Sequence, residues 1–147
     1  MSTVEGVLAS LVGAWRLIIW EEIRSDGSVH YPLGPEAIGQ LVYDASGHVS
    51  AQLVRPGGER FGSDDWQSAT SDERATAWRD YFGYFGTFRI NEVEHAVVHE
   101  IEGSWFPNLA GVEQVRRYQL DGNRLNLHGD TARGQIRIVW ERFESRE

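Results

Sequence analysis

Apolar and polar residues alternate one by one along two stretches in the second half of the chain, residues 97–102 and 112–120. A period of two residues is typical of a β-strand that has two different faces. The more apolar face of the first stretch also carries His99, and that of the second carries Gln114 and Arg116. Burying polar groups costs free energy unless they are bonded. These faces therefore predict the wall of a ligand pocket.

The same alternation, interrupted by turn signals such as Asp26-Gly27, predicts strands along most of the chain. A wider loop is expected at 129–134. Short links make neighbouring strands antiparallel, and a long sheet avoids exposed edges by closing on itself. We therefore expect an all-β fold, a closed antiparallel up-and-down barrel of roughly eight to ten strands that can hold one small ligand. The expected strands are 15–24, 29–31, 38–43, 48–54, 87–90, 96–102, 112–120, 124–127 and 135–143.

Two segments show helical rather than strand spacing. Apolar residues in 4–11 recur at intervals that suit a short N-terminal helix. Thr70 and Glu73 form the hydroxyl and carboxylate ends of a capping box, which predicts one inserted helix over about 71–82. We expect this helix to lie across one end of the barrel. Its apolar side would carry Ala75, Trp78, Phe82 and Phe85.

Composition narrows the functional classes. The 147 residues, 41% of them hydrophobic, suit one domain, 1–147, and a net charge of −8 argues against nucleic acid and against an anionic membrane surface as partners. The absence of cysteine excludes disulfides and thiolate metal sites. Residues 1–11 have neither a basic region nor a long apolar run, so we expect no signal peptide, no membrane span and a cytoplasmic location.

Gly13-x-Trp15, at the head of the first long strand, resembles the lipocalin signature. In lipocalins this tryptophan closes the floor of the barrel, and an arginine on the last strand packs over it. The resemblance implies that role for Arg142, with Arg137 as the alternative.

The chain is also similar, over nearly its whole length, to bacterial and fungal proteins called lipocalin-like domain proteins. The resemblance implies a lipocalin-like barrel and an association with secondary metabolism, but it implies no particular activity. The matching segments are 11–17, 31–35, 50–53 with Arg55-Pro56, 84–87, 102–104 with 106–108, and 113–117.

His99 and Arg116 are the candidates for chemistry. His99 is either a core histidine bonded to a neighbour or a pocket donor and general base. An inward guanidinium at Arg116 needs an anion. That anion is either a carboxylate of this chain or a carboxylate or phenolate of a ligand. The carboxylates in question are Glu100, Glu102 and Glu113.

Five further residues are candidates for contact with a ligand. Gln52 is either a sheet-surface residue or a pocket residue. Tyr43 and Tyr118 can be core aromatics with their hydroxyls at a wet rim. Trp105, next to Phe106 in an expected loop, suggests a pocket mouth or a homodimer contact. Gln114 shares its face with Arg116.

Metal and cofactor chemistry lack sequence support. The five histidines are scattered without an HExxH or His-x-His pattern, and no glycine-rich nucleotide loop is present. We therefore expect neither a metal nor a cofactor.

Two hypotheses of function follow. One is a binding protein and the other is an enzyme, and the sequence does not decide between them. The first is a barrel that binds a small, mostly apolar, aromatic or polyketide-like molecule in secondary metabolism. The alternative is a cofactor-independent cyclase, isomerase or dehydratase, with His99 as acid/base and Arg116 stabilising an oxyanion. Gln52, Gln114 and Tyr118 would then orient the substrate. A third hypothesis, a protein that binds a partner protein, rests only on the expected exposed aromatic residues.

The side chains of His99 and Arg116 should lie close together in the folded protein. If the stretches around His99 and Arg116 form an antiparallel hairpin, His99 falls opposite about Val115, between Gln114 and Arg116.

Overall fold

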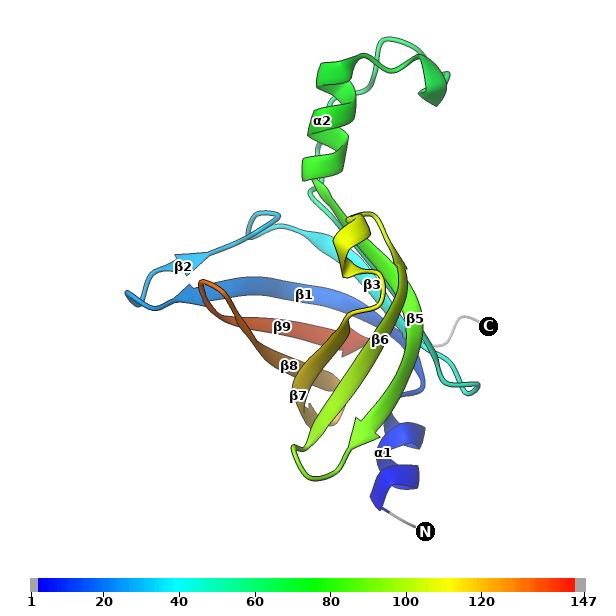
Figure 1. The fold of residues 1–147 in the computed structure, drawn as a ribbon, viewed down its shortest axis with the longest axis vertical. Helices are drawn as coiled ribbons and strands as arrows, with labels where there is room; N and C mark the ends of the chain where they lie inside the picture. Colours follow the sequence, from blue (N-terminus) through cyan, green and yellow to red (C-terminus); the bar gives the residue numbers. More distant parts are fainter. Residues whose placement is uncertain (1–2, 145–147) are drawn as a thin grey trace.

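The computed structural model describes residues 3–144 as nine strands and two α-helices (Figure 1). Each strand from β3 onward pairs antiparallel with its sequence neighbour, and β1 pairs with both β3 and β9. The expected closed antiparallel barrel is thereby confirmed. The helices are α1 (Thr3–Leu11) and α2 (Ser71–Arg79), and the strands are β1 (Gly13–Arg24), β2 (Val29–His30), β3 (Ile38–Tyr43), β4 (His48–Val54), β5 (Tyr81–Asn91), β6 (Ala96–Ser104), β7 (Glu113–Asp121), β8 (Arg124–Thr131) and β9 (Gly134–Arg142), with short 3-10 turns η1 (Trp66–Ser68) and η2 (Pro107–Leu109).

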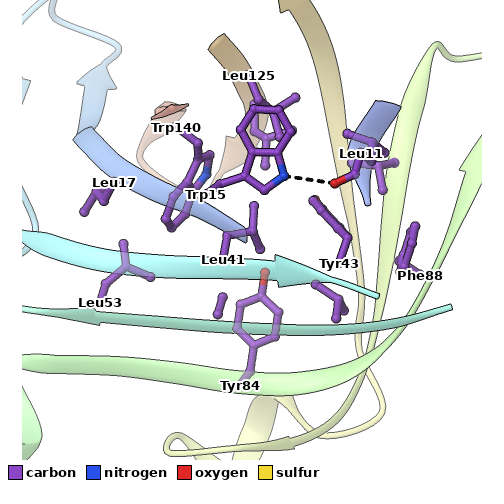
Figure 2. Packing of buried hydrophobic residues seen from close by; sticks show 14 of the residues in the cluster. Leu11, Trp15, Leu17, Leu41, Tyr43, Leu53, Tyr84, Phe88, Leu125 and Trp140 are labelled. Carbon is purple, nitrogen blue, oxygen red and sulfur yellow. Dashed lines mark hydrogen bonds between the residues drawn. The ribbon is translucent and has the colours of Figure 1, made fainter. Parts of the chain in front are cut away.

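One end of the barrel is closed around Trp15. Its indole nitrogen donates a 2.9 Å hydrogen bond to the carbonyl of Leu11, at the end of α1 (Figure 2). The guanidinium of Arg142 lies over the indole, 4.2 Å from the ring centre. Arg142 therefore has the role that the resemblance implied, whereas Arg137 binds Glu21 through a 2.9 Å ion pair.

The barrel interior at this end is a packed core. Figure 2 shows side chains from β1, β3, β5, β8 and β9 meeting there, among them Trp15, Tyr43, Phe88 and Leu125. These residues occupy alternate positions of their strands, as the hydrophobic pattern predicts. The packing fills the barrel near α1 and leaves the cavity toward the other end.

The inserted helix differs from the prediction. Its capping box is present, with Thr70 Oγ1 accepting from the Glu73 amide at 3.1 Å, but α2 ends at Arg79. Phe82 and Phe85 belong instead to β5, where the backbone pairs with β4 and β6 on both sides. α2 projects from the rim rather than lying across it, and none of its residues is buried (Figure 1). Within residues 3–144, no helix is long and apolar enough to cross a bilayer.

The predicted wide loop at 129–134 is wrong. β8 continues to Thr131 and β9 begins at Gly134, so only two residues form the turn. Gly134 makes this possible because its φ is +153°, and a Cβ there would lie 2.2 Å from the Ile23 carbonyl oxygen. A glycine at this position lets β9 begin directly against β1.

Candidate functional site

The interior contains a cavity of about 590 Å³ at the end away from α1. Residues of the β8–β9 turn and of η2 lie at its mouth, and β1 and each strand from β3 to β9 contribute side chains to its wall. The wall is largely aromatic and aliphatic, and includes Trp20, Leu53, Phe82, Ile138 and Trp140. Such a wall favours an apolar ligand.

His99 is the most buried polar residue of this wall, with 1% of its surface exposed. The alternation of β6 turns it inward between aliphatic neighbours. Its Nε2 lies 2.6 Å from the Tyr43 hydroxyl and its Nδ1 lies 2.6 Å from the Tyr84 hydroxyl. Both ring nitrogens therefore have partners, contributed by β3 and β5.

Burial sets the protonation of this cluster. It lowers the pKa of His99 to about 3, helped by the nearby charge of Arg116, so the imidazole is neutral at physiological pH. Burial also raises the pKa of Tyr43 and of Tyr84 above the ordinary phenol value. The cluster is one neutral imidazole between two protonated phenols.

Arg116 lies beside this cluster on the inner face of β7. Its guanidinium packs against Gly129 of β8, where a Cβ would come within 2.6 Å of Nη1. Nη1 donates to the neighbouring Val115 carbonyl at 3.2 Å. Burial lowers the pKa of Arg116, but a guanidinium starts so high that it stays charged.

Of the two alternatives for Arg116, the ion pair with a carboxylate of this chain is wrong. Glu100 and Glu113 lie on the outer face, where both bind Arg89, at 2.8 and 2.5 Å. Glu102 is also exposed. Among residues 3–144 no carboxylate pairs with Arg116. The reason is strand alternation, which sends these glutamates to the face opposite Arg116.

An aromatic cluster surrounds the cavity mouth. The Trp105 ring lies 4.4 Å from Phe82 and 5.6 Å from Trp78 of α2, measured between ring centres. Trp78 and Trp105 also donate their indole N–H groups to each other's carbonyls, at 3.3 and 3.2 Å. Trp105 and Phe106 line the cavity. They thus occupy the pocket-mouth position, one of the two expected alternatives.

The hairpin of β6 and β7 brings together the three residues singled out in the sequence. His99 pairs with Gln114, and Val97 with Arg116, one residue away from the expected register. His99, Gln114 and Arg116 all line the cavity.

Three other candidates lie elsewhere. Gln52 is on the outer face of β4, where it accepts a 2.6 Å hydrogen bond from Tyr81. Tyr43 lies behind His99 with no exposed surface, so its expected place at a wet rim is wrong. Tyr118 is also buried, stacked 4.2 Å from the His95 ring and outside the cavity wall.

The sequence pattern did not indicate Tyr84, Trp20 or Glu22 as cavity residues. Tyr84 lies between the expected helix at 71–82 and the expected strand at 87–90, although its alternation with Phe82 is a usable signal. Trp20 and Glu22 face inward because β1 shifts its pairing with β9 between Leu17 and Ile19. Strict alternation from Trp15 places them outside, so no local signal could have found them.

Metal binding finds no support among the described residues. Within residues 3–144 no group of three or more histidine, aspartate or glutamate side chains is placed to hold a metal ion.

Comparison with known proteins places the barrel in a family. The family model described as the lipocalin-like domain matches residues 12–143. The chain belongs to the lipocalin-like domain family. This lipocalin-like chain is also 34% identical over 85 residues, 54% of its own length and 77% of the relative, to the 4'-hydroxy-3'-methoxypropiophenone carrier protein ppsC of Aspergillus oryzae.

Two solved structures are similar to the lipocalin-like barrel at low identity. A redesigned β-barrel matches 93% of this chain and 95% of its own, at 15% identity and a TM-score of 0.47. The lipoprotein YedD of Klebsiella pneumoniae matches 94% of this chain and 75% of its own, at 14% identity and a TM-score of 0.43.

Proposed function

We propose that this lipocalin-like protein binds a small, mostly apolar aromatic molecule inside its barrel and acts as a carrier in secondary metabolism. The observation that carries the proposal is the interior cavity of about 590 Å³, with an aromatic wall and few polar groups. Pockets of roughly 300–1,000 Å³ with this make-up bind small organic ligands. The similarity to a carrier of an aryl ketone supports the same interpretation.

The geometry favours a carrier over the cofactor-independent cyclase, isomerase or dehydratase. A general base works best when its pKa is near the operating pH and when it can reach the proton it removes. The pKa of His99 is lowered to about 3, and both of its ring nitrogens already face phenol hydroxyls. Proton abstraction by His99 would require one of these buried hydrogen bonds to break.

The proposal is tested by titrating the protein with 4-hydroxyacetophenone and following tryptophan fluorescence, because Trp20, Trp105 and Trp140 line the cavity. We expect a saturable change and recovery of the ketone unaltered. Ala51→Leu, which adds bulk to the wall, should weaken binding at least about tenfold.

Ser50→Leu is the matched control, because Ser50 precedes Ala51 on β4 and belongs to the opposite face. It should leave the affinity unchanged. An absence of saturable binding across a panel of aryl ketones would overturn the carrier proposal, and chemical conversion of the ketone would favour the enzyme.

A cytoplasmic location and a homodimer stay predictions. Cell fractionation and sedimentation velocity would test them.

A further inference from the structure

The cluster around His99 holds one more hydrogen-bond proton than its own contacts use. Tyr43 and Tyr84 each carry one O–H group, and a neutral imidazole carries one N–H group. The two contacts at His99 use two of these three donors. One phenol proton is therefore left without an acceptor inside the cluster.

Burial decides which phenol keeps that proton. Tyr43 has no exposed surface and makes no other hydrogen bond within residues 3–144. A free O–H group there would be a buried donor without an acceptor, which costs free energy. Tyr84 lines the cavity, and in Figure 2 its hydroxyl points from β5 into the barrel interior. The favoured arrangement has Tyr43 donating to Nε2, and Nδ1–H donating to the Tyr84 oxygen. The Tyr84 O–H is then free to donate into the cavity.

Asp130 acts electrostatically on Arg116 but forms its ion pair with Arg117, so Arg116 adds a positive charge at the same place that is not held in an ion pair. Its charge acts on His99, Tyr43 and Tyr84, and it has no carboxylate partner within residues 3–144. The cavity-lining carboxylate of Glu22 is bonded to Arg24 at 3.1 Å instead. A partly buried cation that is not held in an ion pair is costly, and a ligand anion would offset that cost.

We propose that the cavity takes its aromatic ligand as an oxyanion, a phenolate or an aryl carboxylate, whose oxygen accepts from Tyr84 and lies beside Arg116. This inference rests on the proposed function and adds the charge state and orientation of the ligand. The anionic oxygen points to the β5–β7 wall, and the ring lies among Trp20, Phe82 and Ile138.

The test compares 4-nitrophenol with 4-nitroanisole, which has the same ring but cannot ionise. The absorbance of the phenolate reports the charge of the bound phenol directly. We expect bound 4-nitrophenol to titrate at least about one pH unit lower than the free compound. Arg116→Gln should abolish this shift and weaken phenolate binding at least about tenfold, with little effect on 4-nitroanisole.

Arg117→Gln is the matched control, because Arg117 is the next residue of β7, exposed on the outer face. In the Arg117→Gln variant, bound 4-nitrophenol should titrate at the same lowered pH as it does in the unmodified protein. Tyr84→Phe removes the O–H with little change of shape and should also weaken phenolate binding about tenfold. It provides a second test if Arg116→Gln does not fold.

Two outcomes separate this inference from the function on which it rests. If both compounds bind equally well and bound 4-nitrophenol titrates like the free phenol, the oxyanion inference is overturned and the carrier proposal stands. If neither these compounds nor aryl ketones bind, both are overturned.

Discussion

The imidazole of His99 is held neutral by two effects that act in the same direction. Burial disfavours the imidazolium, and the guanidinium of Arg116 repels it. The hydroxyls of Tyr43 and Tyr84 fix the ring from both sides. His99 is therefore a fixed polar group of the cavity wall at neutral pH, and its protonation is coupled to folding.

Acid should destabilise the protein through His99. Its pKa falls from 6.5 to about 3 on folding, so the unfolded chain binds the proton first as the pH drops. Above about pH 6.5 the contribution of the neutral His99 to the free energy of unfolding is fully present. As the pH falls from there toward 3, this free energy decreases by up to about 1.4 kcal/mol per pH unit. Urea unfolding at several pH values within this window should show a steep loss of stability.

His99→Gln should flatten this acid dependence, because the amide does not titrate. His30→Gln is the control, since His30 is exposed on β2, and it should leave the slope unchanged. Equal acid sensitivity of His99→Gln and the wild type would contradict the assignment.

At the scale of the element, β5 contributes Phe82 and Tyr84 to the cavity wall. It shifts its pairing with β6 between Phe85 and Gly86. At this shift the strands approach so closely that a Cβ on Gly86 would lie 1.9 Å from the Glu100 carbonyl oxygen. Gly86 thus permits the close pairing that sets the position of Tyr84 on β5.

Gly86→Ala should be strongly destabilising, because a backbone oxygen of β6 cannot move aside as a flexible side chain can. We expect a loss of more than about 3 kcal/mol in the free energy of unfolding, measured with urea. Gly58→Ala is the matched control, since nothing lies within 4 Å of a Cβ built there, and it should be nearly neutral. A mild effect of Gly86→Ala would show that β6 can shift away.

At the scale of the whole molecule, Arg142 joins α1, β1 and β9 at the closed end. It lies over Trp15, and its Nη1 donates to the Val12 carbonyl at 2.9 Å while Nη2 donates to that of Ser10. A cation suits these carbonyls at the end of a helix. Gly13 leaves room for it, because a Cβ there would lie 2.6 Å from Nη1. This accounts physically for the glycine of the Gly13-x-Trp15 motif.

Arg142→Met should lower the free energy of unfolding by about 2–4 kcal/mol, through loss of the cation–π contact and of charged hydrogen bonds. Ligand affinity should not change, because Arg142 and Trp15 do not line the cavity. Arg137→Met, which removes a part-exposed pair with Glu21, should cost no more than about 1 kcal/mol. Urea unfolding and fluorescence titration of both variants check these expectations, and equal losses would contradict the closing role of Arg142.

Alternation along the chain by itself determined the barrel and one wall of its cavity. The period of two places His99 on one face of its strand and Arg116 on one face of the next, and a short loop makes these strands neighbours. A local pattern suffices here because strand alternation and hairpin pairing both act over short separations in sequence. The one-residue difference in register, with His99 opposite Gln114, arises within the loop, where alternation gives no information.

The tertiary structure alone decided the opposite wall and the state of the polar groups. The extra residue in β1 between Leu17 and Ile19 turns Trp20 and Glu22 inward, and only pairing with the distant β9 reveals it. β5 is a strand because β4 and β6 satisfy its backbone on both sides, although its sequence also suits the end of a helix. The neutral imidazole and the unpaired guanidinium depend on burial and on charges from several strands, and these are set only when the barrel closes.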